Sequence, residues 1–330
     1  MNLKTFVTGA DGMLGTNVVL ELLSRNHELV CLVHPSSKST TLNNLPVKVV
    51  QGDILNVSSF ESYLADCDYV IHIAASTSVW PRRNEMVNRV NIEGTRNLMS
   101  ASQRAGLKRF IHVGSANSFD PGTIDDLGTE ANDYTGWKYK NDYLDSKYKA
   151  QVMLLEEFKK NAFPVIVISP TFMLGEYDSG PSSGRLLLSM VEGKVPGYSK
   201  GVKNYVHAKD VAVAIANALT MGKLGQAYIA GNENLDYLTF FNKVKKISGV
   251  EKKLIHFPFP LALIGGFFSS VIARIIKKQP GLSYGMVQLM GIEQYYSSEK
   301  AVNELKMPQN SADQAIEDCL NWFRANNIKL

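Results

Sequence analysis

The stretch KTFVTGADGMLGTNVVLELL, residues 4–23, decides the fold. A short apolar run leads directly into Gly9, Gly12 and Gly15, and apolar residues at helical spacing follow. A strand that turns through glycines into a helix offers free backbone amides at a helix N-terminus, where phosphate groups bind. Gly9 permits the sharp turn, Gly12 lets a pyrophosphate approach the backbone, and Gly15 lets helix and strand pack closely. The stretch therefore predicts a dinucleotide-binding βαβ unit.

Strand-like and helix-like patterns alternate through the first half of the chain. The expected strands are Lys4–Thr8, Glu28–His34, Val47–Asp53, Tyr69–Ala75, Arg109–Ser115, Pro164–Pro170 and, as a seventh, Gln226–Ala230. Helical patterns occupy residues 14–22, 60–64, 84–105 and 142–160. Strands that alternate with helices imply right-handed crossovers and a parallel sheet. We therefore predict an α/β fold with a doubly wound parallel sheet of the Rossmann type.

The alternation weakens after the sixth strand, which predicts two parts. We expect residues 1–172 to form the NAD(P)-binding Rossmann core. Residues 173–330 should form mainly a smaller, partly interleaved substrate-binding lobe, with residues 202–231 returning to the core. Gly and Pro punctuate residues 175–201, which predicts loops on the substrate side.

Composition narrows the class of protein. The chain has 330 residues, of which 45% are hydrophobic and 20% charged, as in ordinary globular proteins. The net charge is +4 with the basic residues scattered, so no nucleic-acid partner is expected. The three cysteines have no metal-ligand spacing and their odd number argues against a disulfide framework, so we expect no metal site. The N-terminus has no signal-peptide pattern, and we expect a cytoplasmic protein.

One apolar segment, Phe257–Ala273, carries no charge and is followed by Arg274, Lys277 and Lys278. It is interrupted by prolines and glycines and is shorter than the roughly 20 residues of a spanning helix. Leu261, Ile264, Phe268, Ile272 and Ile275 recur at helical spacing. We expect a helix buried in a lid or a dimer contact, with an interfacial membrane helix as the alternative. Membrane association is not the favoured expectation.

The end of the second strand bears on cofactor choice. An Asp or Glu there would bind the ribose diol of NAD, but the sequence LVHPSSKST contains no acid. His34, Ser36, Ser37 and Lys38 can instead hold a 2′-phosphate, which favours NADP, with NAD as the alternative. Asp53 can accept a hydrogen bond from the adenine amino group or, alternatively, cap the following segment.

The run YLDSK, residues 143–147, supplies an acid/base pair. Tyr143 and Lys147 share a face if this run is helical. A cation within a few ångströms can lower a tyrosine pKa of about 10 by about 1–3 units. Ser115 ends the fifth strand, at the edge where a parallel sheet binds its ligand, and can donate a hydrogen bond to a carbonyl oxygen.

These motifs occur in an order that resembles the extended short-chain dehydrogenase/reductases (the NAD-dependent epimerase/dehydratase family), within them the dihydroflavonol 4-reductase-like group. The matching pieces are TGADGMLG at 8–15, GD at 52–53, HIAA at 72–75, NIEGTRNL at 91–98, GSA at 114–116, YLDSK at 143–147, SPTFMLG at 169–175, VHAKDVAVAIANAL at 206–219 and SSEKAVNELKMP at 297–308. The resemblance implies a catalytic Ser115, Tyr143 and Lys147, with Pro170 near the nicotinamide. The expected cofactor contacts are Gly9, Gly12, Met13, Leu14, Gly15, His34, Ser37, Lys38, Asp53, Ile54, Ala74, Ala75, Tyr143, Lys147 and Pro170. It also implies a homodimer.

The sequence departs from the family pattern at three positions. Gly114 precedes Ser115 where the family usually has a pair of serines. His34 stands where an NADP-binding arginine is often found, which weakens the preference for NADP. Gln151 replaces a common acidic residue after the active-site lysine, and we expect no consequence for the chemistry.

We predict hydride transfer between NADP(H) and a small-molecule ketone, aldehyde or matching alcohol, with Tyr143 as general acid/base. The alternatives are a nucleotide-sugar epimerase or dehydratase, a 3β-hydroxysteroid dehydrogenase-like enzyme, and a non-catalytic NADP sensor. Against an epimerase, the residues after Ser115 lack the valine-tyrosine-glycine usual there.

Several other side chains are assigned more loosely. Trp80, Trp137, Phe172 and Tyr198 are candidates to line an apolar pocket, and Arg82 and Arg83 to meet an anionic substrate. The expected structural residues are His72 and His112 in buried strands, His207 in a loop, and Asp210 as a helix cap.

Overall fold

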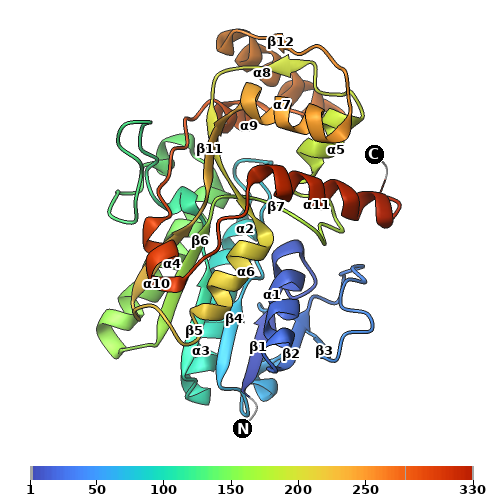
Figure 1. Cartoon of the computed structure of the whole chain (residues 1–330). Coiled ribbons are helices and arrows are strands. Elements are labelled where there is room, and N and C mark those ends of the chain that lie inside the picture. Colours follow the sequence, from blue (N-terminus) through green and yellow to red (C-terminus); the bar gives the residue numbers. More distant parts are fainter. Residues whose placement is uncertain (1–2, 279, 329–330) are drawn as a thin grey trace.

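The computed structural model describes residues 3–278 and 280–328. Its central element is a seven-stranded parallel sheet with the order β10-β6-β5-β4-β1-β2-β3 (Figure 1). The strands are β1 (Lys4–Thr8), β2 (Glu28–Val33), β3 (Lys48–Gln51), β4 (Tyr69–His72), β5 (Arg109–Val113), β6 (Val165–Pro170) and β10 (Gln226–Ala230). All seven expected strands are confirmed. Strand order reverses between β1 and β4, and such a switch point is where doubly wound sheets bind ligands.

Helices cover both faces of this sheet, which confirms the doubly wound fold. On one face lie α1 (Met13–Ser24) and α6 (Ala208–Asn217), whose apolar side chains pack together against the sheet. On the other face lie α3 (Thr95–Ala105) and α4 (Asp142–Asn161). The core is therefore two apolar layers, one on each side of strands that read as continuous hydrophobic runs.

Two connections differ in detail from the expected helices. The expected helix at 84–105 forms as α2 (Glu85–Asn88), a π-helical turn (Arg89–Gly94) and α3 in succession. The prediction of a helix at residues 60–64 is wrong. Two single 3-10 turns, Val57–Ser59 and Glu61–Tyr63, stand there instead. Phe60 and Leu64 are both fully buried in the core. Their spacing therefore reflects two separate buried side chains and not one face of a longer helix.

Most of the remaining elements form a lobe beyond the carboxyl ends of the strands (Figure 1). Its strands are β7 (Phe172–Leu174), β9 (Val202–His207) and β11 (Glu233–Asp236) in one sheet, and β8 (Gly197–Tyr198) with β12 (Ile255–His256) in another. Its helices are α5 (Arg185–Val191), α7 (Tyr237–Ser248), α8 (Phe259–Ile275), α9 (Tyr284–Met290) and α11 (Ala312–Ala325). One further helix, α10 (Glu299–Leu305), lies outside the lobe, beside β10 of the main sheet and α6. The lobe has its own core, in which Tyr205 stacks on Phe240 with ring centroids 4.1 Å apart.

The stretch 202–231 connects the lobe and the sheet. It begins as β9 in the three-stranded sheet, continues as α6 against α1, and ends as β10 at the edge of the seven-stranded sheet. The chain therefore passes from the lobe back to the main sheet within thirty residues.

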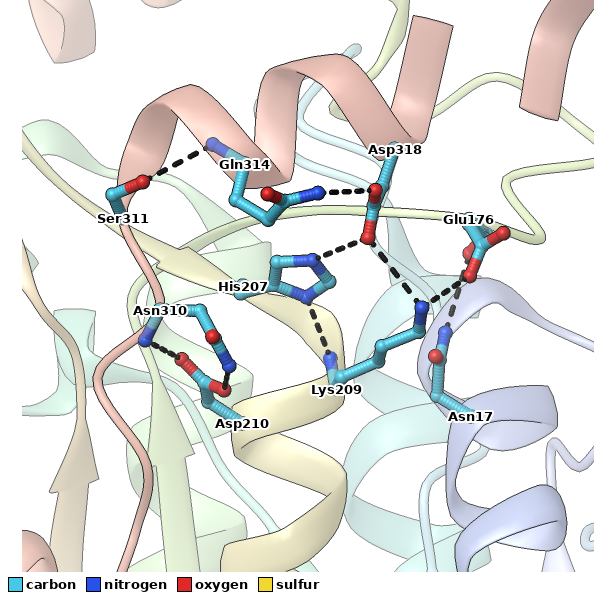
Figure 2. Close-up of polar contacts among 9 residues, drawn as sticks. All are labelled: Asn17, Glu176, His207, Lys209, Asp210, Asn310, Ser311, Gln314 and Asp318. Carbon is cyan, nitrogen blue, oxygen red and sulfur yellow. Dashed lines mark hydrogen bonds and ion pairs between the residues drawn. The ribbon is translucent and has the colours of Figure 1, made fainter. Parts of the chain in front are cut away.

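A polar cluster fastens α11 to the start of α6 (Figure 2). His207 Nδ1 accepts a hydrogen bond from the Lys209 backbone N–H at 3.1 Å, so His207 caps α6. Because Nδ1 is an acceptor, the proton is assigned to Nε2, which donates to Asp318 at 3.0 Å. Asp210 does not cap the helix as expected. It accepts from the backbone N–H of Asn310 at 2.8 Å and thereby holds the segment that leads into α11.

The same cluster reaches α1. Lys209 Nζ lies 2.6 Å from the Glu176 carboxylate and 3.4 Å from that of Asp318. The Asn17 side chain, on α1, donates to the backbone carbonyl of Glu176 at 3.2 Å. Figure 2 shows these groups converging from α1, α6, α11 and the loop after β7. The lobe is thus tied directly to the helix that follows the glycine-rich turn.

The apolar segment forms the expected helix, α8, but its orientation is the reverse of the expected one. Leu261, Ile264, Phe268, Ile272 and Ile275 are each more than half exposed. The side that α8 buries carries small residues instead, because the helix packs closely against α9 through them. Among the residues that the structure describes, no helix has both the length and the hydrophobicity to cross a membrane.

Candidate active site

The glycine-rich turn lies at the carboxyl ends of β1 and β4, where the strand order reverses. Gly9 has φ +65°, and a Cβ there would lie 2.7 Å from the Ala74 backbone nitrogen. A Cβ on Gly15 would lie 2.0 Å from the Gly9 carbonyl oxygen. Both positions therefore require glycine for reasons internal to the chain. The turn brings the backbone of Gly9 close to that of Ala74, a second residue proposed to contact the cofactor.

Gly12 is different, because a Cβ there would be in no closer contact than 3.6 Å. Packing within the chain does not demand a glycine at this position. Gly12 is also the N-cap of α1, and no side chain caps this helix among the residues that the structure describes. The amides of Met13, Leu14 and Gly15 form its first turn, where a helix offers free N–H groups and a partial positive charge. The turn therefore fits a pyrophosphate.

A cavity of about 780 Å³ opens beside this turn. It is lined by Asp11, Gly12, Met13, Ser37, Lys38, Ser39, Thr40, Thr41, Tyr177, Asp178, Ser179, Gly180, Ser182, Trp322, Asn326 and Ile328. Four of the expected cofactor residues are thus brought to one wall: Gly12, Met13, Ser37 and Lys38. The rest of the lining was not predicted from the sequence. Most of it comes from the loop after β7 and from α11, where Tyr177 and Trp322 lie with ring centroids 5.9 Å apart.

The loop after β2 carries the residues expected to select NADP. His34 Nδ1 shares a hydrogen bond of 2.7 Å with the Ser36 hydroxyl. The Ser37 hydroxyl donates to the carboxylate of Asp11, which fixes this loop against the glycine-rich turn. Lys38 lines the cavity beside them. Asp11 was missed at the sequence level, although its place inside the glycine turn was a usable signal.

Asp53 lies at the end of β3, near this loop. Its Oδ1 accepts a hydrogen bond from the Leu55 backbone N–H at 2.9 Å, and its other oxygen lies 3.9 Å from His34 Nε2. Asn56, not Asp53, precedes the 3-10 turn that follows, so the capping alternative is wrong. The adjacent Ile54 packs against Gly94, which leaves no room for a Cβ there.

Ser115, Tyr143 and Lys147 lie together at the carboxyl end of β5. Ser115 follows the strand, and its Oγ accepts from the Asn117 backbone N–H at 3.3 Å. Tyr143 stands in the first turn of α4, which the Asn141 side chain caps. Lys147 lies one turn further, and its Nζ donates to the Val113 carbonyl at 2.6 Å. The three candidate catalytic residues are therefore assembled by one strand end and one helix.

Burial shifts both members of the tyrosine–lysine pair. Desolvation lowers the pKa of Lys147 to about 8, because a charged ammonium loses its hydration inside the protein. Desolvation also raises the pKa of Tyr143, and a hydrogen bond from Ser115 partly offsets this rise. The direction for Tyr143 is opposite to the one expected from Lys147 alone. In this structure removal from water is the largest cause of the shift in the pKa of Tyr143.

A chain of buried hydrogen bonds connects Thr8 on β1, His72 on β4 and the π-helical turn next to this region. Thr8 Oγ1 accepts from the Ala74 N–H at 3.2 Å and lies 2.8 Å from His72 Nδ1. His72 Nε2 lies 3.0 Å from Thr95 Oγ1, which itself donates to the Asn91 carbonyl at 2.7 Å. Because Thr95 donates onward, His72 Nε2 carries the ring proton. Burial lowers the pKa of His72 to about 3, so it is neutral and structural, as expected.

Asn91 extends this chain of hydrogen bonds to the catalytic helix. Its side chain accepts from the Ser76 N–H at 2.7 Å and donates to the Ser76 carbonyl at 3.0 Å and to Ser146 Oγ at 2.9 Å. Ser146 in turn donates to the Tyr143 carbonyl at 3.0 Å. Asn91 sits in the π-helical turn, within the NIEGTRNL motif, but its role was not predicted. It holds the loop after β4 against α4.

Two of the three departures from the family pattern, Gly114 and Gln151, lie beside the Ser169 hydroxyl. A Cβ on Gly114 would lie 2.8 Å from the Ser169 hydroxyl and 3.0 Å from Val167, so a serine there would not fit this packing. Gln151 accepts a hydrogen bond from the same Ser169 hydroxyl at 3.4 Å. Pro170, next along β6, pairs with Ala230 at the sheet's edge.

The side chains named above as candidates for a substrate pocket or an anion contact mostly do not lie together in the structure. Trp137 is 66% exposed, and Phe172 packs edge-on against Tyr205 in the lobe core. Arg83 lies 2.7 Å from Asp142 and 3.2 Å from Asp145, so it is a structural ion-pair residue rather than a free anion receptor.

Arg82 donates to Gln288 at 3.3 Å and lies over the Tyr284 ring. Tyr198 pairs through β8 with β12. Both nitrogens of buried His112 have no hydrogen-bond partner within the described part of the chain. In residues 3–278 and 280–328 no cluster of three or more His, Cys, Asp or Glu side chains could hold a metal.

Comparisons with known proteins give a family model and several relatives that match most of this chain. The model of the NAD dependent epimerase/dehydratase family matches residues 5–231. A protein of Synechocystis sp., provisionally named a dihydroflavonol 4-reductase, is 29% identical over 324 residues, which cover 97% of this chain and 94% of that protein. Sterol demethylase protein B of Methylococcus capsulatus is 25% identical over 331 residues, covering 99% and 100%. The crystal structure of gox2253 superposes with a TM-score of 0.86 at 29% identity, covering all of both chains.

Proposed function

Since the chain belongs to the NAD-dependent epimerase/dehydratase family of extended short-chain dehydrogenase/reductases, we propose that it reduces a ketone or aldehyde with NADPH, or oxidises the matching alcohol. Membership makes it an NAD(P)-dependent oxidoreductase. One observation carries the finer proposal. Ser115, Tyr143 and Lys147 are grouped at the carboxyl end of β5, two strands from the glycine-rich turn after β1.

In the proposed reaction the bound nicotinamide supplies or accepts the hydride. Tyr143 Oη gives its proton to the carbonyl oxygen as negative charge develops there, a contribution of about 10²–10⁴-fold. The raised pKa of Tyr143 keeps that proton in place at neutral pH, as a general acid requires. The Ser115 hydroxyl donates to the same oxygen and stabilises the oxyanion. Lys147 orients the nicotinamide ribose and favours the tyrosinate that remains.

Oxidation of NADPH against carbonyl substrates tests this proposal. Tyr143→Phe should lower kcat by at least about 100-fold, while Tyr148→Phe on the same helix should leave it within about twofold. Binding of NADPH, followed by its fluorescence, should be retained in Tyr143→Phe, because the ring remains. Equal turnover by wild type and Tyr143→Phe would remove this tyrosine from the mechanism.

We propose NADP as the preferred cofactor. The loop after β2 offers Ser37 and Lys38 at the cavity wall and His34 nearby, with no acid at the end of β2 to bind a ribose diol. Against this stands Asp11, whose carboxylate already engages Ser37. Titration with NADPH and NADH decides between them. Lys38→Ala should weaken NADPH binding about tenfold and NADH binding little, whereas Lys48→Ala on β3 should change neither. Tighter binding of NADH than NADPH by wild type would overturn the preference.

We propose a lipophilic cyclic ketone or alcohol as the substrate class. The sterol demethylase relative aligns with essentially the whole chain, including the lobe. Trp80, in the loop after β4, lies beneath Arg274 at the end of the apolar helix α8. A panel of steroid ketones, aromatic ketones and nucleotide sugars tests this class. Turnover of nucleotide sugars alone would favour the epimerase alternative.

A further inference from the structure

The helix α8 exposes its large side chains and buries its small ones. Six residues, Leu261, Ile264, Phe267, Phe268, Ile272 and Ile275, are between 53% and 75% exposed. We call these six the α8 apolar face. The buried residues of the helix are Gly266, Ser270 and Ala273. This is the reverse of an amphipathic helix that serves its own core, whose bulky residues face inward.

Such a face indicates an external partner. A contiguous apolar surface of this kind is unusual on a monomeric protein and marks a contact with protein, membrane or ligand. The close packing of α8 on α9 explains its stability in the exposed position. The Ser270 hydroxyl accepts a hydrogen bond from the Tyr284 backbone N–H at 2.8 Å, and a Cβ on Gly266 would lie 2.9 Å from Val287. The helix is therefore held with its bulky side outward by specific contacts.

The charges around the face identify the partner. Residues 252–292 contain Lys252, Lys253, Arg274, Lys277 and Lys278 but no Asp or Glu. Arg274, Lys277 and Lys278 are exposed directly at the end of α8. An isologous contact of α8 with a second copy would bring Arg274, Lys277 and Lys278 to both sides, and residues 252–292 supply no carboxylate to pair with them. An anionic lipid surface offers both an apolar layer and negative headgroups.

The length of α8 sets how it would lie. Its 17 residues rise about 26 Å at 1.5 Å each, less than the bilayer core together with its interfaces. It also follows Pro258, and within residues 3–278 and 280–328 no polar side chain caps that end. These features fit a helix that lies in the plane of the interface rather than one that spans.

We propose that α8 docks this protein on an anionic lipid bilayer. The α8 apolar face enters the acyl boundary, and Arg274, Lys277 and Lys278 contact the headgroups. Arg274 lies over the Trp80 ring at 5.9 Å, so docking sets the loop after β4 close to the membrane. This inference does not depend on the proposed reaction, because it concerns binding alone.

Vesicle co-sedimentation tests the proposal with the whole chain. Phosphatidylcholine vesicles containing about one third phosphatidylglycerol should bind wild type at least about tenfold more tightly than pure phosphatidylcholine vesicles. The double variant Phe267→Ser/Phe268→Ser should lose at least about tenfold in binding to the anionic vesicles. The control Ile124→Ser, at an apolar residue 70% exposed elsewhere, should bind as wild type does.

Charge variants separate the electrostatic contribution. Lys277→Gln/Lys278→Gln should weaken binding to anionic vesicles about tenfold and leave binding to neutral vesicles unchanged. The matched control is Lys159→Gln/Lys160→Gln, an exposed pair at the end of α4, which should have no effect. Far-UV circular dichroism and NADPH binding confirm that each variant is folded.

Two results would overturn the proposal. One is wild-type binding to anionic vesicles no stronger than that of Phe267→Ser/Phe268→Ser. The other is a wild-type protein that dimerises in analytical ultracentrifugation and does not bind vesicles, together with a double variant that is monomeric. That second result would assign the α8 apolar face to another copy of the chain.

Discussion

Replacing Lys147 with methionine should stabilise the nucleotide-free protein at neutral pH. Lys147 is 5% exposed, and burial lowers its pKa from 10.5 to about 8. A difference of about 2.5 units corresponds to about 3 kcal/mol that the folded state loses by holding the ammonium charged at pH 7. Methionine has similar length and no charge, so it removes that penalty. It also removes the hydrogen bond to the Val113 carbonyl, worth about 1 kcal/mol. The expected net gain is about 2 kcal/mol.

The gain should depend on pH in a defined direction. Below about pH 8 the lysine is charged in both states, and the wild type bears the full penalty. Between about pH 8 and 10.5 the folded protein releases the proton while the unfolded chain still binds it, so wild-type stability rises with pH. At pH 9.5 the penalty falls to about 1.4 kcal/mol, and the advantage of Lys147→Met shrinks below about 0.5 kcal/mol.

Reversible urea unfolding at pH 7 and pH 9.5 measures both quantities. Lys149→Met, an exposed neighbour on α4, is the matched control and should change stability by less than about 0.5 kcal/mol at either pH. The wild type should be the less stable protein at pH 7 and yet the active one. A Lys147→Met protein that is less stable than wild type at pH 7, or a gain that does not shrink by pH 9.5, would refute the dominance of desolvation.

Three further outcomes are expected. Gly15→Ala should destabilise the fold by about 3 kcal/mol in urea unfolding, since its Cβ would lie 2.0 Å from the Gly9 oxygen. Gly265→Ala should be neutral or stabilising, because no atom of the described residues lies within 4 Å of the added Cβ. Ser115→Ala should lower kcat by about 10–100-fold with little change in nucleotide affinity, measured by steady-state kinetics and NADPH titration. Burial raises the pKa of Asp318, but hydrogen bonds from Gln314 and His207 outweigh burial, so the pKa of the folded protein is lowered. The Asp318 carboxylate therefore stabilises the fold above about pH 4 and loses this effect below it. The difference in unfolding free energy between wild type and Asp318→Asn should accordingly narrow as the pH falls from 5 to 3.

Much of the candidate site was readable because it depends on short-range sequence. The glycine turn after β1 is set by steric demands on adjacent residues, and Gly9 and Gly15 meet them. Tyr143 and Lys147 share a face because they lie one helical turn apart. Ser115 follows a strand whose end is marked by the loss of the apolar run. Each inference needed only the period of a helix or strand and the order of elements.

Other features needed the folded chain, because they join residues far apart in sequence. Asp318 reaches His207 across 111 positions, and Trp322 faces the glycine-turn cavity from the last helix. Arg83 forms ion pairs with Asp142 and Asp145, and no local sequence pattern indicated these pairs. The raised pKa of Tyr143 follows from burial, which spacing to Lys147 does not report.

The helix α8 shows the division most clearly. Its sequence determined a helix, its apolar stripe and the absence of acids around it. Only the tertiary structure decided which side faces α9, because close approach of two helices selects Gly266, Ser270 and Ala273 and so turns the larger residues outward. Periodicity defines the two faces of a helix, whereas the shape of the neighbouring surface determines which of them is buried.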